Sequence, residues 1–354
     1  MKPENTWIQA LKNKLIPAFI REDYSPYACK VSTNKENYGL KGRLIHAQNL
    51  IKTSINLKRL PFPHPIQCKN CLFDTRMPNI YITKEGICNM CHTYHKNFNP
   101  VILKNELEQF LRRPREAGAQ FDAIVAFSGG KDSTVSLYIA SQEFKLKVIA
   151  VLVDNGFIPE EVIRNGQEIC QHLGVPLRIE TIDFLPELRK LAKTNFRTGY
   201  PCNVCTVLFH DVLSKVATEL KINRVVLGRN WWRYLEPTVK SVRTIRPPQA
   251  DWDIEFMSLP FALQLKEDDQ LPYLQKAGWK PRKLDGHSTN CLIPGLVEKT
   301  VFDRLGYHPE INLLSREVIV GFVSKEKALQ KITQVKDLSS DLKRLLNSEN
   351  QNKH

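Results

Sequence analysis

The sequence predicts an α/β fold, a doubly wound parallel sheet with a small N-terminal module. Three observations predict it. Short apolar runs alternate with amphipathic segments, a glycine-rich turn follows the first run, and two cysteine pairs precede both. The 354 residues are 42% hydrophobic and 25% charged, which excludes a wholly disordered, collagen-like or low-complexity chain. The length allows two or three domains.

Strands and helices are expected to alternate through the middle of the chain. Residues 122–127 and 148–153 are rich in Val, Ile and Ala, as in strands buried on both faces. The predicted helix over 159–173 stops before Gly174, which suits a helix C-terminus. The expected strands are 122–127, 148–153, 177–182 and 225–227, and the expected helices are 101–113, 134–143, 159–173, 211–220 and 325–346.

The chain divides into four expected segments. They are a basic extension over 1–60, a cysteine module over 61–100, the sheet domain over 101–300 and a helical C-terminal segment over 301–354. Three prolines within 61–66 predict an extended linker. The chain has 51 Lys and Arg against 37 Asp and Glu, a net charge of +14. This excess favours anionic partners: nucleic acid, nucleotides, phosphosugars or a membrane surface.

The cysteines and the N-terminal residues together indicate the cellular compartment of the protein. The chain has nine cysteines, and its first residues contain no apolar core of a secretory signal. It also lacks the run of about 20 apolar residues that a membrane helix needs. We therefore expect a cytoplasmic protein without a membrane partner, in which cysteine pairs indicate metal or redox chemistry rather than disulfides.

A glycine-rich turn follows the first strand and has the sequence Ser128-Gly129-Gly130-Lys131-Asp132-Ser133. Its glycines let several backbone N–H groups face one anion, and the following helix adds the positive end of its dipole. Lys131 and the serine hydroxyls can complete a phosphate cradle. Asp132 would repel phosphate unless a divalent cation lies between them, so Mg²⁺ is expected. The alternative is a turn that merely connects strand to helix.

This loop after an apolar strand resembles that of the PP-loop ATP pyrophosphatases, whose fold is Rossmann-like. The resemblance covers about residues 121–235, and the Walker pattern of ordinary P-loop proteins is absent. It implies that ATP is cleaved between its α and β phosphates, that AMP is placed on a substrate oxygen, and that nitrogen or sulfur then displaces it. It also implies that the six loop residues hold ATP, with Lys131 and Asp132 catalytic, and that Asp154, Gly228 and Asn230 lie near the nucleotide.

The first cysteine set is a pair of knuckles, Cys68-x2-Cys71 and Cys88-x2-Cys91. Two such pairs can close one tetrahedral Zn²⁺, and four thiolates leave no open position, so the expected role is structural. The alternative is a reduced surface hairpin with incidental cysteines. His92 and His95 are spare donors and are expected at the surface.

The sequence around the two knuckles, residues 68–78 and 85–91, resembles the N-terminus of bacterial N-acetyl sugar amidotransferases. Residues 314–329 resemble the C-terminal part of the same family. That family implies a sugar substrate, ammonia from a glutaminase partner and a place in surface-polysaccharide synthesis. One position departs from it. The family tends to have Gly-Glu-Asn where this chain has Gly228-Arg229-Asn230, which changes what the pocket accepts.

The second cysteine set is Cys202-x2-Cys205 with the distant Cys291. This layout resembles PP-loop tRNA thiolases, in which three thiolates hold a [4Fe-4S] cluster. A persulfide on one cysteine is a second possibility, and an inert part of the fold is a third. Cys170 lies on an apolar helical face and is expected in the core, and Cys29 has no partner by spacing.

Three functions remain open. The first is an ATP-dependent amidotransferase on an N-acetyl sugar, the second a tRNA-type sulfurtransferase, and the third a non-catalytic nucleotide-binding protein. An oligomer is compatible with each. Weaker candidates are His210 and His287 as base or substrate contact, residues 230–234 as a stacking surface, and the basic residues Lys240, Arg243 and Arg246 as phosphate contacts. Packing or solvent exposure is the alternative for each of them.

Overall fold

The computed structural model describes residues 65–77, 80–197, 199–231, 239–247, 251–281 and 288–347. The basic extension expected over 1–60 lies outside the described residues, together with Cys29. The same holds for His287 and for residues 232–234 of the aromatic segment.

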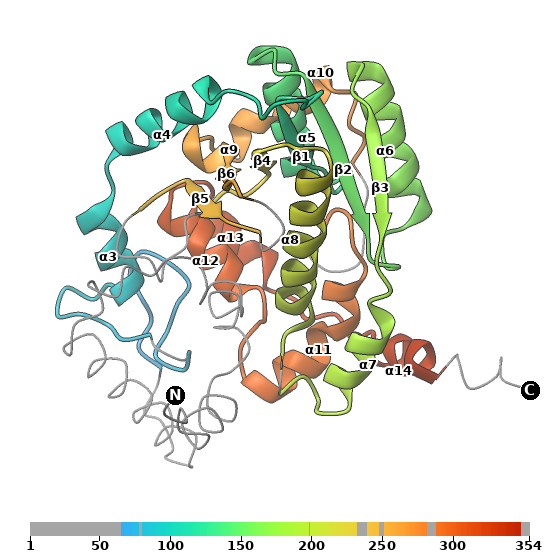
Figure 1. Ribbon diagram of the computed structural model, residues 1–354. Coiled ribbons are helices and arrows are strands. Elements are labelled where there is room, and N and C mark those ends of the chain that lie inside the picture. The colour runs from blue at the N-terminus through green and yellow to red at the C-terminus, as the bar shows by residue number, and fades with distance from the viewer. Residues whose placement is uncertain are drawn as a thin grey trace, which may run out of the picture.

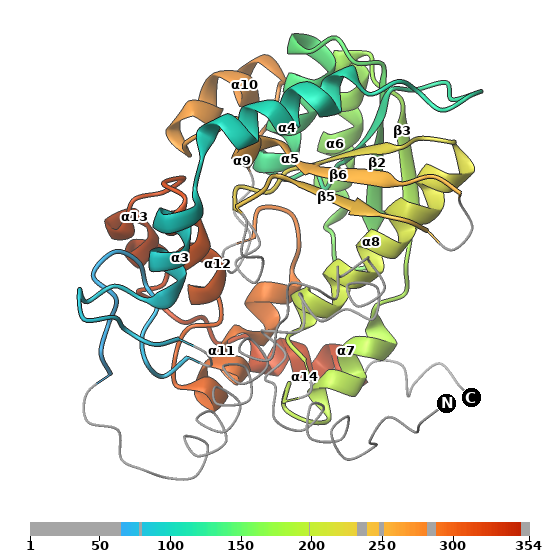
Figure 2. The same ribbon diagram turned by 60° about the vertical axis from the view of Figure 1, so that its left-hand side comes forward.

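In the described part of the chain, six strands form one sheet in the order β3-β2-β1-β4-β6-β5 (Figures 1 and 2). The four predicted strands are β1 (Ala123–Ala126), β2 (Val148–Asp154), β3 (Leu177–Thr181) and β4 (Arg224–Leu227), and they run parallel. Two further strands extend this sheet. β6 (Ile254–Ser258) is parallel to β4, and β5 (Val242–Ile245) is an antiparallel edge. The predicted parallel sheet is confirmed for every strand except β5.

Helices cover both faces of this sheet. Successive strand side chains point to opposite faces. Val125 of β1 packs in one core with α5 (Lys131–Tyr138) and α6 (Glu160–Leu173), whereas Ile124 packs in another core with α8 (Pro201–Glu219). Figure 1 shows α8 in front of the sheet and α5 behind it. The doubly wound architecture is therefore confirmed. Cys170 is buried in the first core, as expected.

Three helices differ from their predicted bounds. α5 begins at the loop and continues as a π-helix, η2 (Ile139–Glu143). α8 begins at Pro201 rather than at residue 211, because proline suits the first helical position. The helix expected over 325–346 is two helices, α13 (Lys325–Lys331) and α14 (Ser339–Asn347). The second starts where the Asp337 carboxylate accepts hydrogen bonds from the backbone N–H and hydroxyl of Ser339.

The cysteine module and the C-terminal helices share one hydrophobic core. The module ends in α3 (Asn89–Asn97), and its cysteines pack with Phe322 and with α12 (Ile311–Ile319). At the start of α13, Lys325 Nζ donates to the carbonyl oxygens of Cys68 at 2.8 Å and Lys69 at 3.0 Å. The remaining helices among the described residues are α4 (Pro100–Arg112), α7 (Leu185–Ala192), α9 (Leu259–Ala262), η3 (Asp268–Gln270), α10 (Leu271–Lys276) and α11 (Ile293–Leu305).

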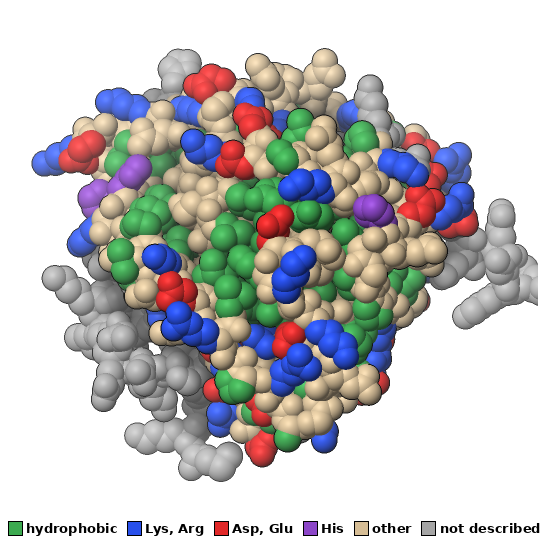
Figure 3. Space-filling model, turned by 90° about the horizontal axis from the view of Figure 1, so that it is seen from above, with side chains coloured by type: hydrophobic (Ala, Val, Ile, Leu, Met, Phe, Trp, Pro, Cys, Tyr) green, Lys and Arg blue, Asp and Glu red, His purple; other side chains and the backbone are tan. Residues whose placement is uncertain are grey.

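The positively charged side chains are not concentrated on the upper face of the molecule. On the face seen from above, Lys and Arg side chains are interspersed with Asp and Glu side chains rather than gathered in one basic patch (Figure 3). Among the described helices, none has both the length and the apolar character needed to cross a bilayer.

Candidate active site

The phosphate loop lies between β1 and α5, at the carboxyl end of the sheet, where open α/β sheets bind ligands. Two glycines let the backbone pack there. Gly129 has a φ of +74°, and a Cβ on it would lie 2.9 Å from Val162 Cγ1. A Cβ on Gly228, at the end of β4, would lie 2.7 Å from the backbone nitrogen of Ser133. No side chain fits between β4 and the loop.

Hydrogen bonds within the loop fix its shape. The Gly130 carbonyl accepts the hydroxyls of Ser133 at 3.0 Å and Thr134 at 2.9 Å. Ser133 Oγ in turn accepts the backbone N–H of Ser128 at 3.2 Å. Gly130 is the residue that precedes α5, and it supplies no side-chain cap. The first N–H groups of α5 therefore remain suited to an anion, which fits the phosphates of ATP.

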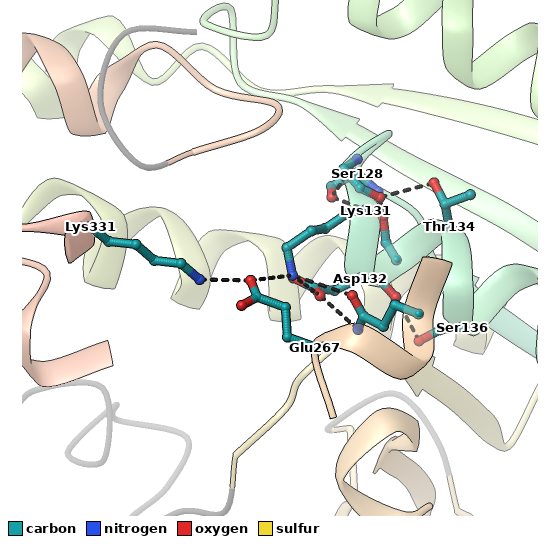
Figure 4. Close-up of polar contacts among 10 residues, drawn as sticks. Ser128, Lys131, Asp132, Thr134, Ser136, Glu267 and Lys331 are labelled. Atoms are coloured by element: carbon teal, nitrogen blue, oxygen red, sulfur yellow. Dashed lines mark hydrogen bonds and ion pairs between the residues drawn. The ribbon is translucent and has the colours of Figure 1, made fainter. Parts of the chain in front are cut away.

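Lys131 and Asp132 lie at the centre of a polar network (Figure 4). Lys131 Nζ is 2.7 Å from Asp132 Oδ1 and 3.3 Å from Gln270 Oε1, and Gln270 Nε2 donates to the same Asp132 oxygen at 2.9 Å. Lys131 also lies 5.0 Å from the ring centre of Phe322. Burial lowers the pKa of Lys131, but the carboxylates around it, Asp132 first, outweigh burial and raise that pKa overall. The ammonium is therefore charged when it meets a phosphate.

Two cavities meet at this loop. The smaller, about 240 Å³, has apolar walls from Val151, Val153, Phe209 and Leu213 beside the loop, which suits a flat aromatic base. The larger, about 690 Å³, extends from Lys131 to Cys202 on α8 and to Glu317 on α12. Its volume falls within the range of small-molecule sites. The two cavities share seven wall residues: Lys131, Asp132, Thr206, Gly228, Arg229, Thr289 and Asn290.

Two of the expected nucleotide contacts lie beside these cavities rather than in their walls. The Asp154 carboxylate accepts the backbone N–H of Gly156 at 2.9 Å. Asn230 is 1% exposed, and its amide has no hydrogen-bond partner among the described residues. The neighbour of Asn230, Arg229, does line both cavities, and it contacts His210 Nε2 at 2.9 Å.

The second cysteine set converges on Asn155, which follows β2. Asn155 Nδ2 donates to Cys205 Sγ at 3.3 Å and to Cys291 Sγ at 3.7 Å. Cys202 lies in the wall of the larger cavity. Burial raises the pKa of all three thiols, to about 12 for Cys205. The thiols are thus protonated near neutral pH unless a metal or a cationic partner stabilises the thiolate.

The first cysteine set forms a compact buried group. Among the described residues, Cys68, Cys71, Cys88 and Cys91 are the one set of three or more His, Cys, Asp and Glu whose ligand atoms all lie within 4.8 Å of one another. The backbone N–H groups of Cys88 and Asn70 point at Cys68 Sγ, at 3.1 and 3.4 Å. Four sulfurs with such donors suit one tetrahedral ion. His92 and His95 are exposed, as expected.

Several residues of the site are not marked by any pattern in the sequence. Gln270 is buried against the loop, Glu317 lines the larger cavity, and Glu267 and Lys331 meet there in an ion pair of 2.7 Å. Each of them lies more than 130 positions from the loop in the sequence. No local motif marks them, so only the folded chain brings them together.

The basic residues after β4 have ordinary surroundings. Lys240 is exposed, and Arg246 Nε pairs with Asp253 at 2.7 Å on the protein surface. Neither lines the two cavities at the loop.

This chain is similar to several known proteins. Residues 122–201 match the family model described as "Queuosine biosynthesis protein QueC". An uncharacterised protein of Methanocaldococcus jannaschii is 29% identical over 293 residues, 79% of this chain and 98% of that protein. The tRNA-cytidine(32) 2-sulfurtransferase of Bordetella pertussis is 31% identical over 123 residues, 32% of this chain and 36% of that protein. A solved structure, the U34-tRNA thiolase NcsA of Methanococcus maripaludis with its [4Fe-4S] cluster, is 20% identical with a TM-score of 0.37, covering 76% of this chain and 89% of that chain.

Proposed function

We propose that this chain, whose loop resembles that of the PP-loop ATP pyrophosphatases, is an enzyme that cleaves ATP between the α and β phosphates and adenylates a carbonyl or amide oxygen. The observation that carries this proposal is the junction of two cavities at the loop, one suited to a base and one to an acceptor. The α-phosphorus of ATP would lie where they meet, beside Lys131 and Asp132.

The chain's own groups account for the activation step. The acceptor oxygen attacks the α-phosphorus and pyrophosphate leaves, while the N–H groups at the start of α5 and the Lys131 ammonium hold the charge that develops. Gln270 keeps Lys131 and Asp132 oriented through its two hydrogen bonds. A Mg²⁺ held by Asp132 would offset the repulsion between this carboxylate and the phosphates. Zn²⁺ on the four buried knuckle cysteines would be structural.

For the second step we propose displacement of AMP by ammonia on an N-acetyl sugar. The larger cavity has the size of a small-molecule site, which supports this step. The resemblance of the sequence around the two knuckles to N-acetyl sugar amidotransferases supports it too. Ammonia would come from a glutaminase partner, in the cytoplasm. The Glu310 carboxyl group in the cavity wall can accept a proton that ammonia must lose.

Sulfur transfer to tRNA is the second candidate, favoured by the convergence of Cys205 and Cys291 on Asn155 and by the position of Cys202 in the cavity wall. A [4Fe-4S] cluster bound by these cysteines would supply an iron at which sulfur can bind. Without a cluster, the outer sulfur of a persulfide on Cys202 would attack the adenylated carbon and displace AMP, and a second thiol would then release the product by forming a disulfide with Cys202.

Pyrophosphate release tests the shared first step. We expect release from ATP with a small acceptor and ammonium, and near-complete loss of it in Asp132→Ala and in Ser133→Ala. Asp268→Ala removes an exposed carboxylate near the cavity and should retain activity. Wild-type turnover in the Asp132→Ala and Ser133→Ala variants would refute the loop assignment, and ATP binding without turnover of any acceptor would favour a non-catalytic protein.

Anaerobic metal analysis separates the two second steps. Zinc alone, with no visible absorbance, favours nitrogen transfer. Iron at about three or four per chain, lost in Cys291→Ala, favours sulfur transfer.

A further inference from the structure

A carboxylate in the wall of the larger cavity is shared by two lysines. Glu267 Oε1 lies 2.7 Å from Lys331 Nζ and 3.9 Å from Lys131 Nζ, so both ammonium groups approach the same oxygen atom (Figure 4). Lys131 belongs to the phosphate loop, whereas Lys331 ends α13 in the C-terminal segment. All three line the cavity.

The shared oxygen keeps the two cations at the mouth of the phosphate loop. The Glu267 backbone N–H donates to the Phe322 carbonyl at 2.8 Å, and the Phe322 ring lies beneath Lys131. The Lys131 and Lys331 side chains are 23% and 33% exposed, so both are only partly solvated. Partial burial strengthens their attraction to an anion relative to lysines on the open surface.

The charges around this oxygen are nearly balanced. Lys131 and Lys331 face the carboxylates of Asp132 and Glu267, and the nearby Glu317 is held neutral, since burial and then Asp132 raise its pKa to about 8. A polyphosphate brings several negative charges to the same place. Its oxygens can replace Glu267 as the acceptor for both ammonium groups.

We propose that Lys331 is a second cation of the polyphosphate site, and that Glu267 is the counter-ion which the β and γ phosphates replace. The C-terminal segment thereby completes the site that the loop begins. This inference rests on the proposed function, because it takes ATP as the ligand. It predicts that Lys331 contributes to binding of ATP and pyrophosphate but not of AMP, which lacks the β and γ phosphates.

A neighbouring ion pair provides a matched control. Lys327 lies one turn before Lys331 on α13, and it bonds both carboxylate oxygens of Asp268 at 2.8 Å, next to Glu267. Both pairs tie α13 to the same segment. Lys327 is 50% exposed and lies outside the cavity wall, so it shares the structural role of Lys331 without facing the ligand.

Calorimetric titration of the full chain with magnesium pyrophosphate, α,β-methylene ATP and AMP tests the proposal. In Lys331→Gln we expect pyrophosphate and the ATP analogue to bind about tenfold more weakly, with AMP unchanged. Lys331→Arg should keep most of the affinity, and Lys327→Gln all of it. Glu267→Gln should bind pyrophosphate at least as tightly as wild type, because it removes a competing carboxylate.

Different failures have different meanings. If wild type binds neither pyrophosphate nor the ATP analogue, the proposed function fails. If wild type binds both and Lys331→Gln binds them equally well, or loses AMP affinity to the same extent, the inference alone is overturned. Melting temperatures that fall equally in Lys331→Gln and Lys327→Gln, with no selective loss of pyrophosphate binding, would show that the pair is only structural.

Discussion

The buried residue Glu317 makes the stability of the folded protein depend on pH. Its carboxyl faces Lys131, Asp132, Glu267 and Lys331, and burial first, then Asp132, raises its pKa from 4.5 to about 8. The folded state therefore keeps this proton over a range in which the unfolded state has released it. Linkage then requires that the contribution of Glu317 to stability falls as the pH rises from about 4.5 to about 8.

Glu317→Gln should remove that slope. We expect the variant to gain stability over wild type by an amount of the order of a few kcal/mol at pH 8 and by much less at pH 5. Urea denaturation at the two pH values measures it. Glu326→Gln, which replaces a solvent-exposed glutamate on α13, should show no such pH-dependent gain. An equal effect of Glu317→Gln at both pH values would contradict a raised pKa.

Single residues of the site differ in how well the sequence predicts them. Ser128, Asp132 and their neighbours follow one another in a motif whose chemistry is local. Gln270, Glu267 and Lys331 act through contacts that only folding creates, and glutamine or lysine in a polar segment gives no signal of it. Asn230 was expected in the nucleotide crevice, and the structure buries its amide beside that crevice instead.

At the level of elements, the contact between β4 and α5 depends on Gly228. Its hydrogen faces backbone atoms of Asp132 and Ser133, and a Cβ there would approach them at 2.9 and 2.7 Å. Because backbone cannot rotate away as a side chain can, Gly228→Ala must displace the start of α5. We expect a loss of about 1–3 kcal/mol in stability and at least tenfold weaker ATP binding.

Gly156→Ala is the matched control for this substitution. Gly156 has a φ of +78°, and a Cβ there has no atom within 4 Å, so it brings backbone strain without a clash at the loop. It should cost about 1 kcal/mol while ATP affinity stays the same. Nucleotide titration and denaturation of both variants provide the test, and unchanged ATP binding in Gly228→Ala would show that the contact is not needed.

Strands could be predicted from the sequence where burial on both faces gives a continuous run of apolar residues. β1, β2 and β4 are apolar on both faces, so continuous Val, Ile and Ala runs mark them. β5 contains Arg243 and Thr244 at the sheet edge, and β6 contains Glu255, which pairs with Arg113 at 2.6 Å. In β5 and β6, polar residues interrupt the run of apolar residues, and the partners of these polar residues can lie far away in the sequence. Neither strand is therefore marked in the sequence by the continuous apolar run that marks β1 and β2.

In the molecule as a whole, the cysteine module connects to the phosphate site through α13. The first residue of α13, Lys325, bonds the Cys68 carbonyl, and its last residue, Lys331, bonds Glu267 beside Lys131. Between them, Ala328 is fully buried in the core that contains the four cysteines. A metal on these cysteines would hold that core together, because buried thiols without a metal lose the bonds that order both knuckles.

Metal removal should therefore act on ATP binding from a distance. We expect that a zinc chelator, or Cys71→Ser, lowers the melting temperature and weakens pyrophosphate binding several-fold, although no knuckle residue lines the cavity at the loop. Added Zn²⁺ should restore both properties in the chelated protein but not in Cys71→Ser. In Lys331→Gln, chelation should weaken pyrophosphate binding little further, since the link to the site is already lost. If metal-free protein binds pyrophosphate as tightly as the zinc-loaded form, α13 does not couple the two sites.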